Sequence, residues 1–172
     1  MSEPDLLAPL HAFNFVVKFN QEQVPPPQQP GGTSSAPVQP GGPVSLCGAA
    51  FSECTGIEAT MEPKVIKEGG RNFGPLQRVG PVTFATVILK RGLCRTRDLW
   101  KMFELVGAGA AACRLQVVIT LRDTAGQPIF SWKLHGALPI KFKTADFNAA
   151  GGSSVGIEEL HLAHERLELG EA

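Results

Sequence analysis

The sequence has no excess charge of either sign. Its 172 residues include sixteen basic and sixteen acidic side chains, so the formal net charge at pH 7 is zero. Proteins that bind nucleic acids through the phosphates usually carry a basic patch or a high isoelectric point. We therefore expect no sequence-specific nucleic-acid binding. A low net charge also leaves little repulsion between copies of the chain, which favours self-association.

The chain also lacks a long apolar run. No segment approaches the roughly 20 consecutive apolar residues that a membrane-spanning helix needs. The first residues, Met1 to Asp5, are acidic and lack the basic stretch of a secretory signal. We therefore expect that the chain does not span a membrane and that it is synthesised in the cytoplasm. Apolar residues still make up 43% of the chain, which is enough for the core of a single domain.

Motifs for catalysis, metals and cofactors are scarce as well. The four cysteines have no C-x-x-C spacing, which favours idle thiols over a zinc or redox site. They are Cys47, Cys54, Cys94 and Cys113. The chain has neither a Walker A motif nor a G-x-S-x-G turn. We predict no catalytic, cofactor-binding or metal-binding residues, and no enzymatic activity.

Two loose motif matches have simpler interpretations. Residues 107–112 fit G-x-G-x-x-A, but a dinucleotide-binding turn follows a strand and precedes a helix. Here a predicted helix comes first and a strand follows. His161 and His164 could share a helix face and bind a metal, whereas on a regular strand they would point to opposite faces.

Alternating apolar residues predict a mainly β fold. In residues 13–19, Phe13, Phe15, Val17 and Phe19 alternate with Asn14, Val16 and Lys18. Residues 115–121 and 130–134 form a predicted hairpin around a turn at 123–127. Two further strands are predicted within 44–67, on either side of a tight turn at Gly56. Residues 82–90 would place apolar side chains on both faces of a strand, which predicts a strand buried on both sides.

A single helix is predicted over residues 95–106. Leu99, Met102, Phe103 and Val106 have the spacing of one helix face. Thr96 is the predicted N-cap, and Gly107 ends the helix. We expect the apolar face to pack on the β core.

Two segments are less regular. Residues 20–43 hold seven of the fourteen prolines and almost no apolar bulk, which predicts a loop because little surface can be buried there. Residues 157–169 fit either a helix or a strand with a bulge near Glu158 and Glu159. Leu160 and Leu162 would point inward in the strand.

Several short motifs occur in a fixed order along the chain. They are F-S-E-C-T-G-I at 51–57, E-G-G-R at 68–71, V-I-L-K-R-G-L at 87–93, D-L-W at 98–100, S-W-K-L-H-G-A-L-P-I-K-F at 131–142 and V-G-I-E-E-L-H-L-A-H-E-R-L at 155–167. This order resembles the phage tail tube protein family, whose members also build the inner tube of contractile injection systems. The resemblance implies a small β-sandwich or barrel over residues 1–172 with one packed helix and an insertion at 20–43. It also favours the strand for 157–169.

The resemblance further implies a structural subunit without catalytic residues or cofactors. Copies would form hexameric rings that stack into a hollow tube for DNA or effector cargo, within an assembled tail-like particle. Expected partners are the sheath, the baseplate and tape-measure or effector proteins. The long insertion favours the tube initiator next to the baseplate. The alternative is a monomeric β-barrel module that binds a small apolar ligand.

Charged residues beside glycine turns form the candidate subunit interface. They are Glu68, Gly69, Gly70, Arg71, Lys90 and Arg91. Charged groups beside such apolar strands are not expected inside the core, so we predict that they lie at its rim. In a closed ring, each rim meets the opposite rim of the next copy.

Overall fold

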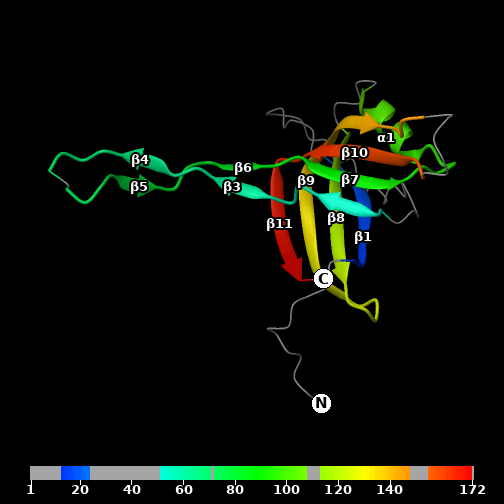
Figure 1. Cartoon of the computed structure of the whole chain (residues 1–172), viewed down its shortest axis with the longest axis horizontal. Helices are drawn as coiled ribbons and strands as arrows, with labels where there is room; N and C mark the ends of the chain where they lie inside the picture. The colour runs from blue at the N-terminus through cyan, green and yellow to red at the C-terminus, as the bar shows by residue number, and fades with distance from the viewer. Residues whose placement is uncertain (1–12, 24–50, 71, 108–112, 148–154, 172) are drawn as a thin grey trace, which may run out of the picture.

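The structure is a computed structural model that describes residues 13–23, 51–70, 72–107, 113–147 and 155–171 (Figure 1). Within these ranges the chain forms eleven strands and one helix. The strands are β1 (Phe15–Gln23), β2 (Glu53–Thr55), β3 (Ala59–Met61), β4 (Lys64–Ile66), β5 (Leu76–Arg78), β6 (Val82–Phe84), β7 (Val87–Gly92), β8 (Cys113–Arg122), β9 (Pro128–Lys143), β10 (Ile157–Ala163) and β11 (Arg166–Glu171). The helix is α1 (Asp98–Gly107). The predicted mainly β fold with one helix is confirmed.

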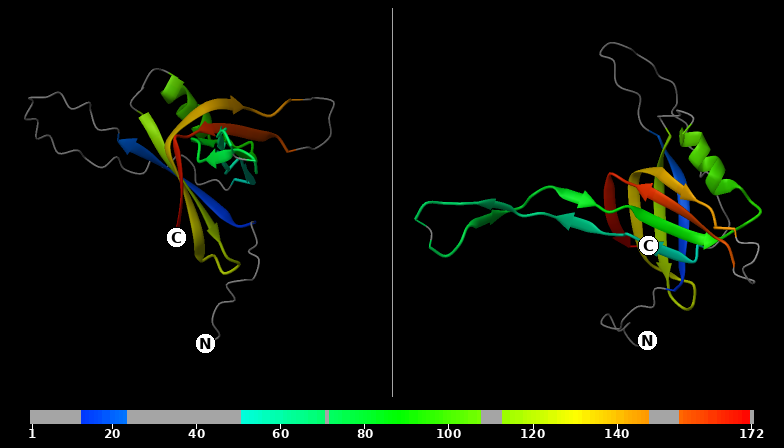
Figure 2. Two further views of the ribbon diagram at one scale, coloured as in Figure 1. Left: turned by 90° about the vertical axis from the view of Figure 1, so that its left-hand side faces the viewer. Right: turned by 45° about the horizontal axis from the view of Figure 1, so that its top comes forward.

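Strand β9 joins two antiparallel sheets. Its first half pairs with β8 and β11, and β8 pairs with β1. Its second half pairs with β10, which continues through β7 to β2. We call β1, β8, the first half of β9 and β11 the first sheet, and the second half of β9, β10, β7 and β2 the second sheet. Figure 2 shows the strands of the two sheets crossing.

The hydrophobic core lies between the two sheets and the helix. The four alternating apolar residues of β8, which are Leu115, Val117, Ile119 and Leu121, are all buried, as their pattern predicts. Leu89 of β7 and Leu160 and Leu162 of β10 meet them from the second sheet. The predicted hairpin is also confirmed, because Val117 is opposite Leu134 and Ile119 is opposite Trp132.

The helix covers one side of this core. It begins at Asp98, and the Arg97 carbonyl accepts the first helical bond from the Lys101 amide at 2.9 Å. The prediction that it starts at residue 95 with Thr96 as N-cap is therefore wrong by a few residues. Leu99 and Met102 are buried, whereas Phe103 and Val106 are only half-buried. The predicted helix face therefore does pack on the core, with Leu99 and Met102 at its centre and Phe103 and Val106 at its edge.

A long two-stranded arm, residues 57–85, projects from the body of the domain (Figures 1 and 2). It consists of the β3–β6 pair next to the body and the β4–β5 pair further out. The arm was not predicted. Residues 82–90 were expected to form one strand buried on both faces, but they divide into β6 in the arm and β7 in the second sheet. Only one face of β7 is fully buried.

Gly56 marks the point where the chain leaves the second sheet and enters the arm. Its φ is +84°, and a Cβ there would lie 2.1 Å from the Thr86 carbonyl oxygen. A side chain is therefore excluded by both backbone conformation and space. The predicted tight turn would require the strands on either side of Gly56 to pair with each other. They do not, because β2 pairs with β7 and β3 pairs with β6.

The C-terminal segment forms strands, as the family resemblance favours. Leu160 and Leu162 of β10 are both buried. The register shift lies between His161 and Leu162, opposite β9, and not at the predicted position near Glu158. Glu158 therefore lies on the same buried face as the two leucines.

The predicted loop at 20–43 begins later than expected. Strand β1 continues to Gln23, because each residue from Asn20 to Gln23 has a partner position on β8. The rest of the predicted loop lies outside the described residues. No helix in the described ranges combines the length and the apolar character that crossing a membrane requires.

Candidate subunit interface

The predicted interface residues lie in three different places. Glu68, Gly69 and Gly70 form part of the far end of the arm (Figure 1). Gly70 has a φ of +84°, and a Cβ on either glycine would meet no atom within 4 Å. Arg71 lies outside the described residues. The end of the arm therefore stands clear of the rest of the described chain.

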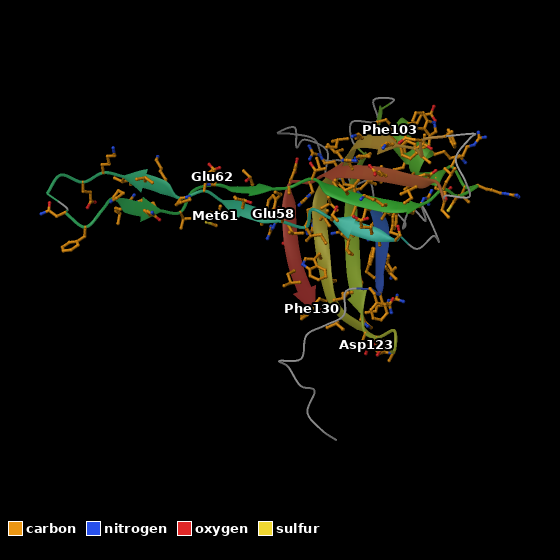
Figure 3. All side chains as sticks on the ribbon, in the orientation of Figure 1. Glu58, Met61, Glu62, Phe103, Asp123 and Phe130 are labelled. Atoms are coloured by element: carbon orange, nitrogen blue, oxygen red, sulfur yellow. The ribbon has the colours of Figure 1, made fainter. Side chains whose placement is uncertain are left out.

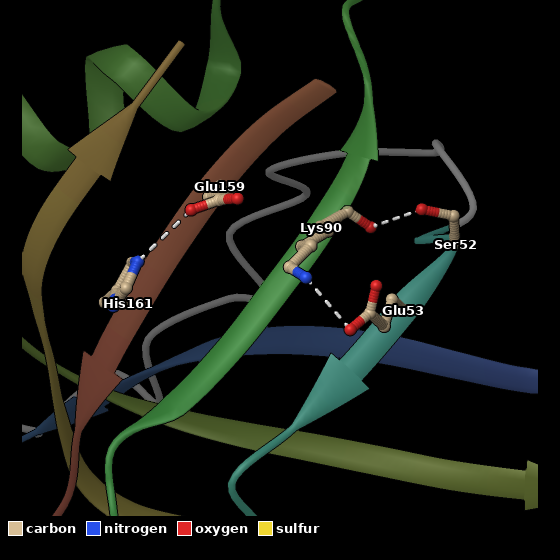
Figure 4. A network of polar contacts seen from close by, with 5 residues as sticks. All are labelled: Ser52, Glu53, Lys90, Glu159 and His161. Carbon is tan, nitrogen blue, oxygen red and sulfur yellow. Dashed lines mark hydrogen bonds and ion pairs between the residues drawn. The ribbon is translucent and has the colours of Figure 1, made fainter. Parts of the chain in front are cut away.

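Lys90 lies in the body of the domain, on β7. Its Nζ is 3.0 Å from Glu53 Oε1 on β2, and its carbonyl oxygen accepts a hydrogen bond from the Ser52 hydroxyl at 3.0 Å (Figure 4). Both charged side chains are partly exposed. Lys90 thus stabilises the short edge strand β2 rather than joining the residues at the end of the arm.

Arg91 contradicts the prediction that these charged groups lie at the rim. Its side chain is only 1% exposed, and its Nε lies 3.0 Å from Glu158 Oε2. The two residues are directly opposite each other on β7 and β10. Because side chains alternate along a strand, Arg91 faces the core together with Val87 and Leu89.

The importance of Glu158 was also missed at the sequence level. Glu158 alternates with Leu160 and Leu162, so a regular strand places all three on one face. A buried carboxylate needs a charged or hydrogen-bonding partner. Arg91 in the neighbouring strand β7 is that partner. The alternation was visible in the sequence, but the partner was not, because pairing across strands depends on register.

The arm carries apolar side chains that are exposed to solvent. They are Met61, Val65, Phe73, Val79 and Val82, and Phe73 is fully exposed. Figure 3 shows side chains along the whole length of the arm, including Glu58, Met61 and Glu62. An isolated two-stranded hairpin is only marginally stable in water. Exposed apolar residues on such a hairpin are therefore typical of a surface that contacts a partner.

The body of the domain has a hollow beside the end of β9 and the start of β10. Four of its lining residues are exposed apolar side chains: Leu93, Phe147, Val155 and Ile157. Lys143, Asp146 and Glu159 also line the hollow. Apolar and charged side chains thus line it together, which suits a partner of the same mixed character.

The first sheet has two open edges. Among the described strands, β1 pairs only with β8, and β11 pairs only with β9. Each edge strand presents unpaired backbone N–H and C=O groups on its outer side, which readily pair with another strand. The second sheet has an open edge at β2, which is only three residues long. The long edges β1 and β11 are therefore the stronger candidates for pairing between copies.

The structure places His161 and His164 beside different partners. No group of three potential metal ligands occurs within the described ranges. His161 Nε2 lies 3.6 Å from Glu159 Oε2 (Figure 4). The His164 ring lies 5.3 Å from the Phe84 ring at the base of the arm. Both His164 ring nitrogens are enclosed and lack a hydrogen-bond partner among the described residues, and this burial lowers the pKa of His164.

Comparison with protein families gives a match over most of the chain. The family described as "T4-like virus tail tube protein gp19" matches residues 11–168. A comparison with curated protein sequences gave no match.

Solved structures of similar fold come from contractile particles. A chain in a six-fold symmetrised cryo-EM structure of the anti-feeding prophage baseplate has a TM-score of 0.73 and 23% identity, with 96% of this chain and 98% of that chain covered. A chain of the PVC sheath–tube complex, an extracellular contractile injection system in its extended state, has a TM-score of 0.71 and 15% identity, with 97% and 95% covered. A chain of the anti-feeding prophage cap has a TM-score of 0.70 and 17% identity, with 99% and 97% covered. At these identities the similarity shows a shared fold.

Proposed function

Because this chain belongs to the T4-like virus tail tube protein family, we propose that its copies close into hexameric rings that stack into a hollow inner tube. The chain is a structural tail tube protein of the type found in contractile injection systems. A monomeric ligand-binding barrel is not favoured by this family membership. The observation that carries the ring proposal is the pair of open edges on the first sheet.

The directions of the strands allow these two edges to join. Strands β1 and β8, β8 and β9, and β9 and β11 are each antiparallel. It follows that β1 and β11 run in opposite directions. In a ring, β11 of one copy therefore meets β1 of the next copy as an antiparallel pair. Ring closure then leaves no open edge on the first sheet.

The number of strands in such a ring leads to a hollow tube. Each copy contributes the four strands of its first sheet. Barrels of roughly 16–18 strands already leave an aqueous channel, and six copies exceed that number. Six-fold symmetry is supported by the family and by the symmetrised baseplate structure that contains a chain of similar fold.

The arm supplies a second contact between copies. Its exposed apolar residues pack on a neighbouring copy, and the hollow around Leu93, Phe147 and Val155 is the proposed receiving surface. Glu68, Gly69 and Gly70 at the end of the arm then meet the charged residues that line this hollow. Arg71, which follows them in the sequence, is proposed for the same contact. Lys90 remains a candidate interface residue beside β2.

The tube conducts DNA or effector cargo and is surrounded by a sheath. Support comes from the similar chains, which belong to a sheath–tube complex, a cap and a baseplate. Baseplate and tape-measure or effector proteins are the other proposed partners. The proline-rich segment at 20–43 supports a position at the start of the tube, next to the baseplate.

Size-exclusion chromatography and negative-stain microscopy of arm variants test the proposed contact. Phe73→Asp and Glu68→Lys should leave the monomer folded, because both side chains are exposed, but should prevent assembly. Thr124→Asp, in the exposed β8–β9 turn, adds a charge elsewhere and serves as the control. Normal tubes from both arm variants would exclude the arm from the interface. If the unmodified protein stayed monomeric at every concentration, the whole proposal would be contradicted.

A further inference from the structure

The side of the first sheet that faces away from the core carries many basic residues. They are Lys18 on β1, Arg114 and Arg122 on β8, Lys133 on β9 and Arg166 on β11. Lys18 and Lys133 are both exposed, and both lie directly opposite Val118 on the strand between them. The two lysines therefore belong to one row across the sheet.

The acidic residues near this face are concentrated toward β11. Glu165 pairs with Arg114, and Glu168 lies 2.6 Å from Arg166. A hydrogen bond with His135 and the positive charge of Arg166 lower the pKa of Glu168, so this carboxylate is ionised at neutral pH. One further acidic position, Glu22, lies opposite Arg114 in the register of β1 and β8.

Two of these basic residues have no acidic partner in the described part of the chain. Lys18 and Arg122 form no ion pair there, and Arg122 Nε is enclosed without a hydrogen-bond partner among the described residues. Lys133 lies opposite Glu168, whose carboxylate also pairs with Arg166. We call Lys18, Arg122 and Lys133 the basic face. Five basic residues on this side of the sheet outnumber the three acidic positions, so the side keeps a net positive charge that a ligand can contact.

We propose that the basic face binds acidic segments of a polypeptide. The inference rests on the proposed ring, in which this face lines the channel and the polypeptide is the cargo. The second sheet and α1 cover the opposite side of the first sheet. When the first sheets of the copies close into a barrel, the second sheet and α1 fit on its outside. The basic face then lies on the inside.

The surroundings favour a polypeptide over a nucleic acid. Proteins that hold single-stranded nucleic acids stack the bases on aromatic side chains, but this side of the sheet has no Phe or Trp among its described residues. Valine and threonine lie between the charges instead, at Val16, Val118 and Thr120. The zero net charge of the chain also argues against a general phosphate-binding surface.

The spacing of the two lysines suits an extended acidic peptide. Two strand spacings of about 4.8 Å place their backbones about 10 Å apart. Carboxylates on one face of an extended chain are two or four residues apart, which separates them by about 7 or 13 Å, since each residue advances the chain by about 3.3 Å. The long, flexible lysine side chains can bridge the remaining difference. One acidic segment can therefore reach both lysines. Repetition of the basic face around a ring would raise the effective concentration of binding sites.

Fluorescence anisotropy with a labelled oligoglutamate peptide and the full-length chain tests this inference. We expect binding at about 0.01 M salt and its loss at about 1 M salt, where the screening length falls to about 3 Å. Lys18→Glu combined with Lys133→Glu should weaken binding roughly tenfold or more, because two attractive pairs become repulsive. The control is Lys101→Glu with Lys141→Glu, which makes the same charge change at exposed positions outside the first sheet and the arm. Circular dichroism checks that both variants are folded.

Several outcomes would overturn the inference. Equal weakening by the control variant would show that only net charge matters. Tighter binding of oligolysine would show that the face has the opposite preference. Tighter binding of a DNA oligonucleotide through the same two lysines would make the face a nucleic-acid surface.

Ring formation is measured separately by microscopy on the same preparations, so the two proposals can fail independently. Rings without lysine-dependent peptide binding would refute the basic face alone. Lysine-dependent binding without rings would refute the tube and leave the binding surface in place.

Discussion

Arg91 and Glu158 form an ion pair inside the β domain, with 3.0 Å between Arg91 Nε and Glu158 Oε2. The pair joins β7 to β10 directly across the register of the second sheet. Both strands also supply fully buried leucines to the core. The pair therefore fixes the relative position of two central strands by a contact that apolar residues cannot provide.

Removal of one partner of this pair should strongly destabilise the fold. We expect Glu158→Gln to lower the free energy of unfolding by about 3–5 kcal/mol, because the arginine charge stays buried. Urea unfolding followed by circular dichroism measures the change. Glu159→Gln is the matched control, because the side chain of Glu159, which is adjacent to Glu158, is not buried in the core. Equal effects of the two substitutions would show that burial of the pair is unimportant.

The orientation of α1 on the core can be tested with two of its leucines. Leu99→Ala should lower the free energy of unfolding by about 2–5 kcal/mol, because Leu99 is fully buried. Leu105→Ala should change it by at most about 0.5 kcal/mol, because Leu105 is exposed. Leucine and alanine have similar helix propensities at both sites, so the difference reports burial. Thermal or urea unfolding of the two variants gives the comparison. Similar decreases in the free energy of unfolding would show that α1 does not pack on the core through the face that contains Leu99.

His164 should make the fold less stable in mild acid. Burial lowers its pKa in the folded chain, whereas an unfolded histidine titrates near about 6.5. Below that pH the unfolded chain binds a proton that the folded chain does not, so the free energy of unfolding decreases as the pH falls through about 6.5. Above that window the effect is absent. His164→Phe keeps a ring next to Phe84 and removes the titration. Parallel stability curves for wild type and variant between pH 8 and 5 would exclude the effect.

The two cysteines whose side chains the structure describes should differ in reactivity. Burial raises the pKa of the Cys54 thiol to about 11, and Cys94 is exposed. Because the thiolate is the reactive form, iodoacetamide at pH 8 should modify Cys94 well before Cys54. Peptide mass spectrometry measures both rates, and denaturant should make them similar. Rapid modification of Cys54 in the folded chain would contradict its burial.

The regular strands could be predicted from the sequence because each has one face against the core. Leu115, Val117, Ile119 and Leu121 alternate strictly, and this pattern has no competing interpretation. Residues 157–169 were ambiguous, since strong helix formers occupy positions that also alternate. Family resemblance indicated the strand, and the fully buried Leu160 and Leu162 confirm it.

The arm and the buried ion pair could not be predicted by the same reasoning. The apolar residues of the arm are exposed in the single chain, so a pattern that assumes burial places Val82–Phe84 in the core strand that follows. The partner of Arg91 depends on the register between β7 and β10, which residue spacing does not contain. Both features are set by contacts between distant segments or between copies.

The central claim is that open sheet edges and the arm join copies of this chain into hollow rings. Negative-stain microscopy of the purified full-length protein over a range of concentrations tests it most directly. The account predicts rings with six-fold symmetry and a central channel, alone or stacked into tubes. Particles that remain monomeric at the highest concentration, with folded β structure by circular dichroism, would contradict it.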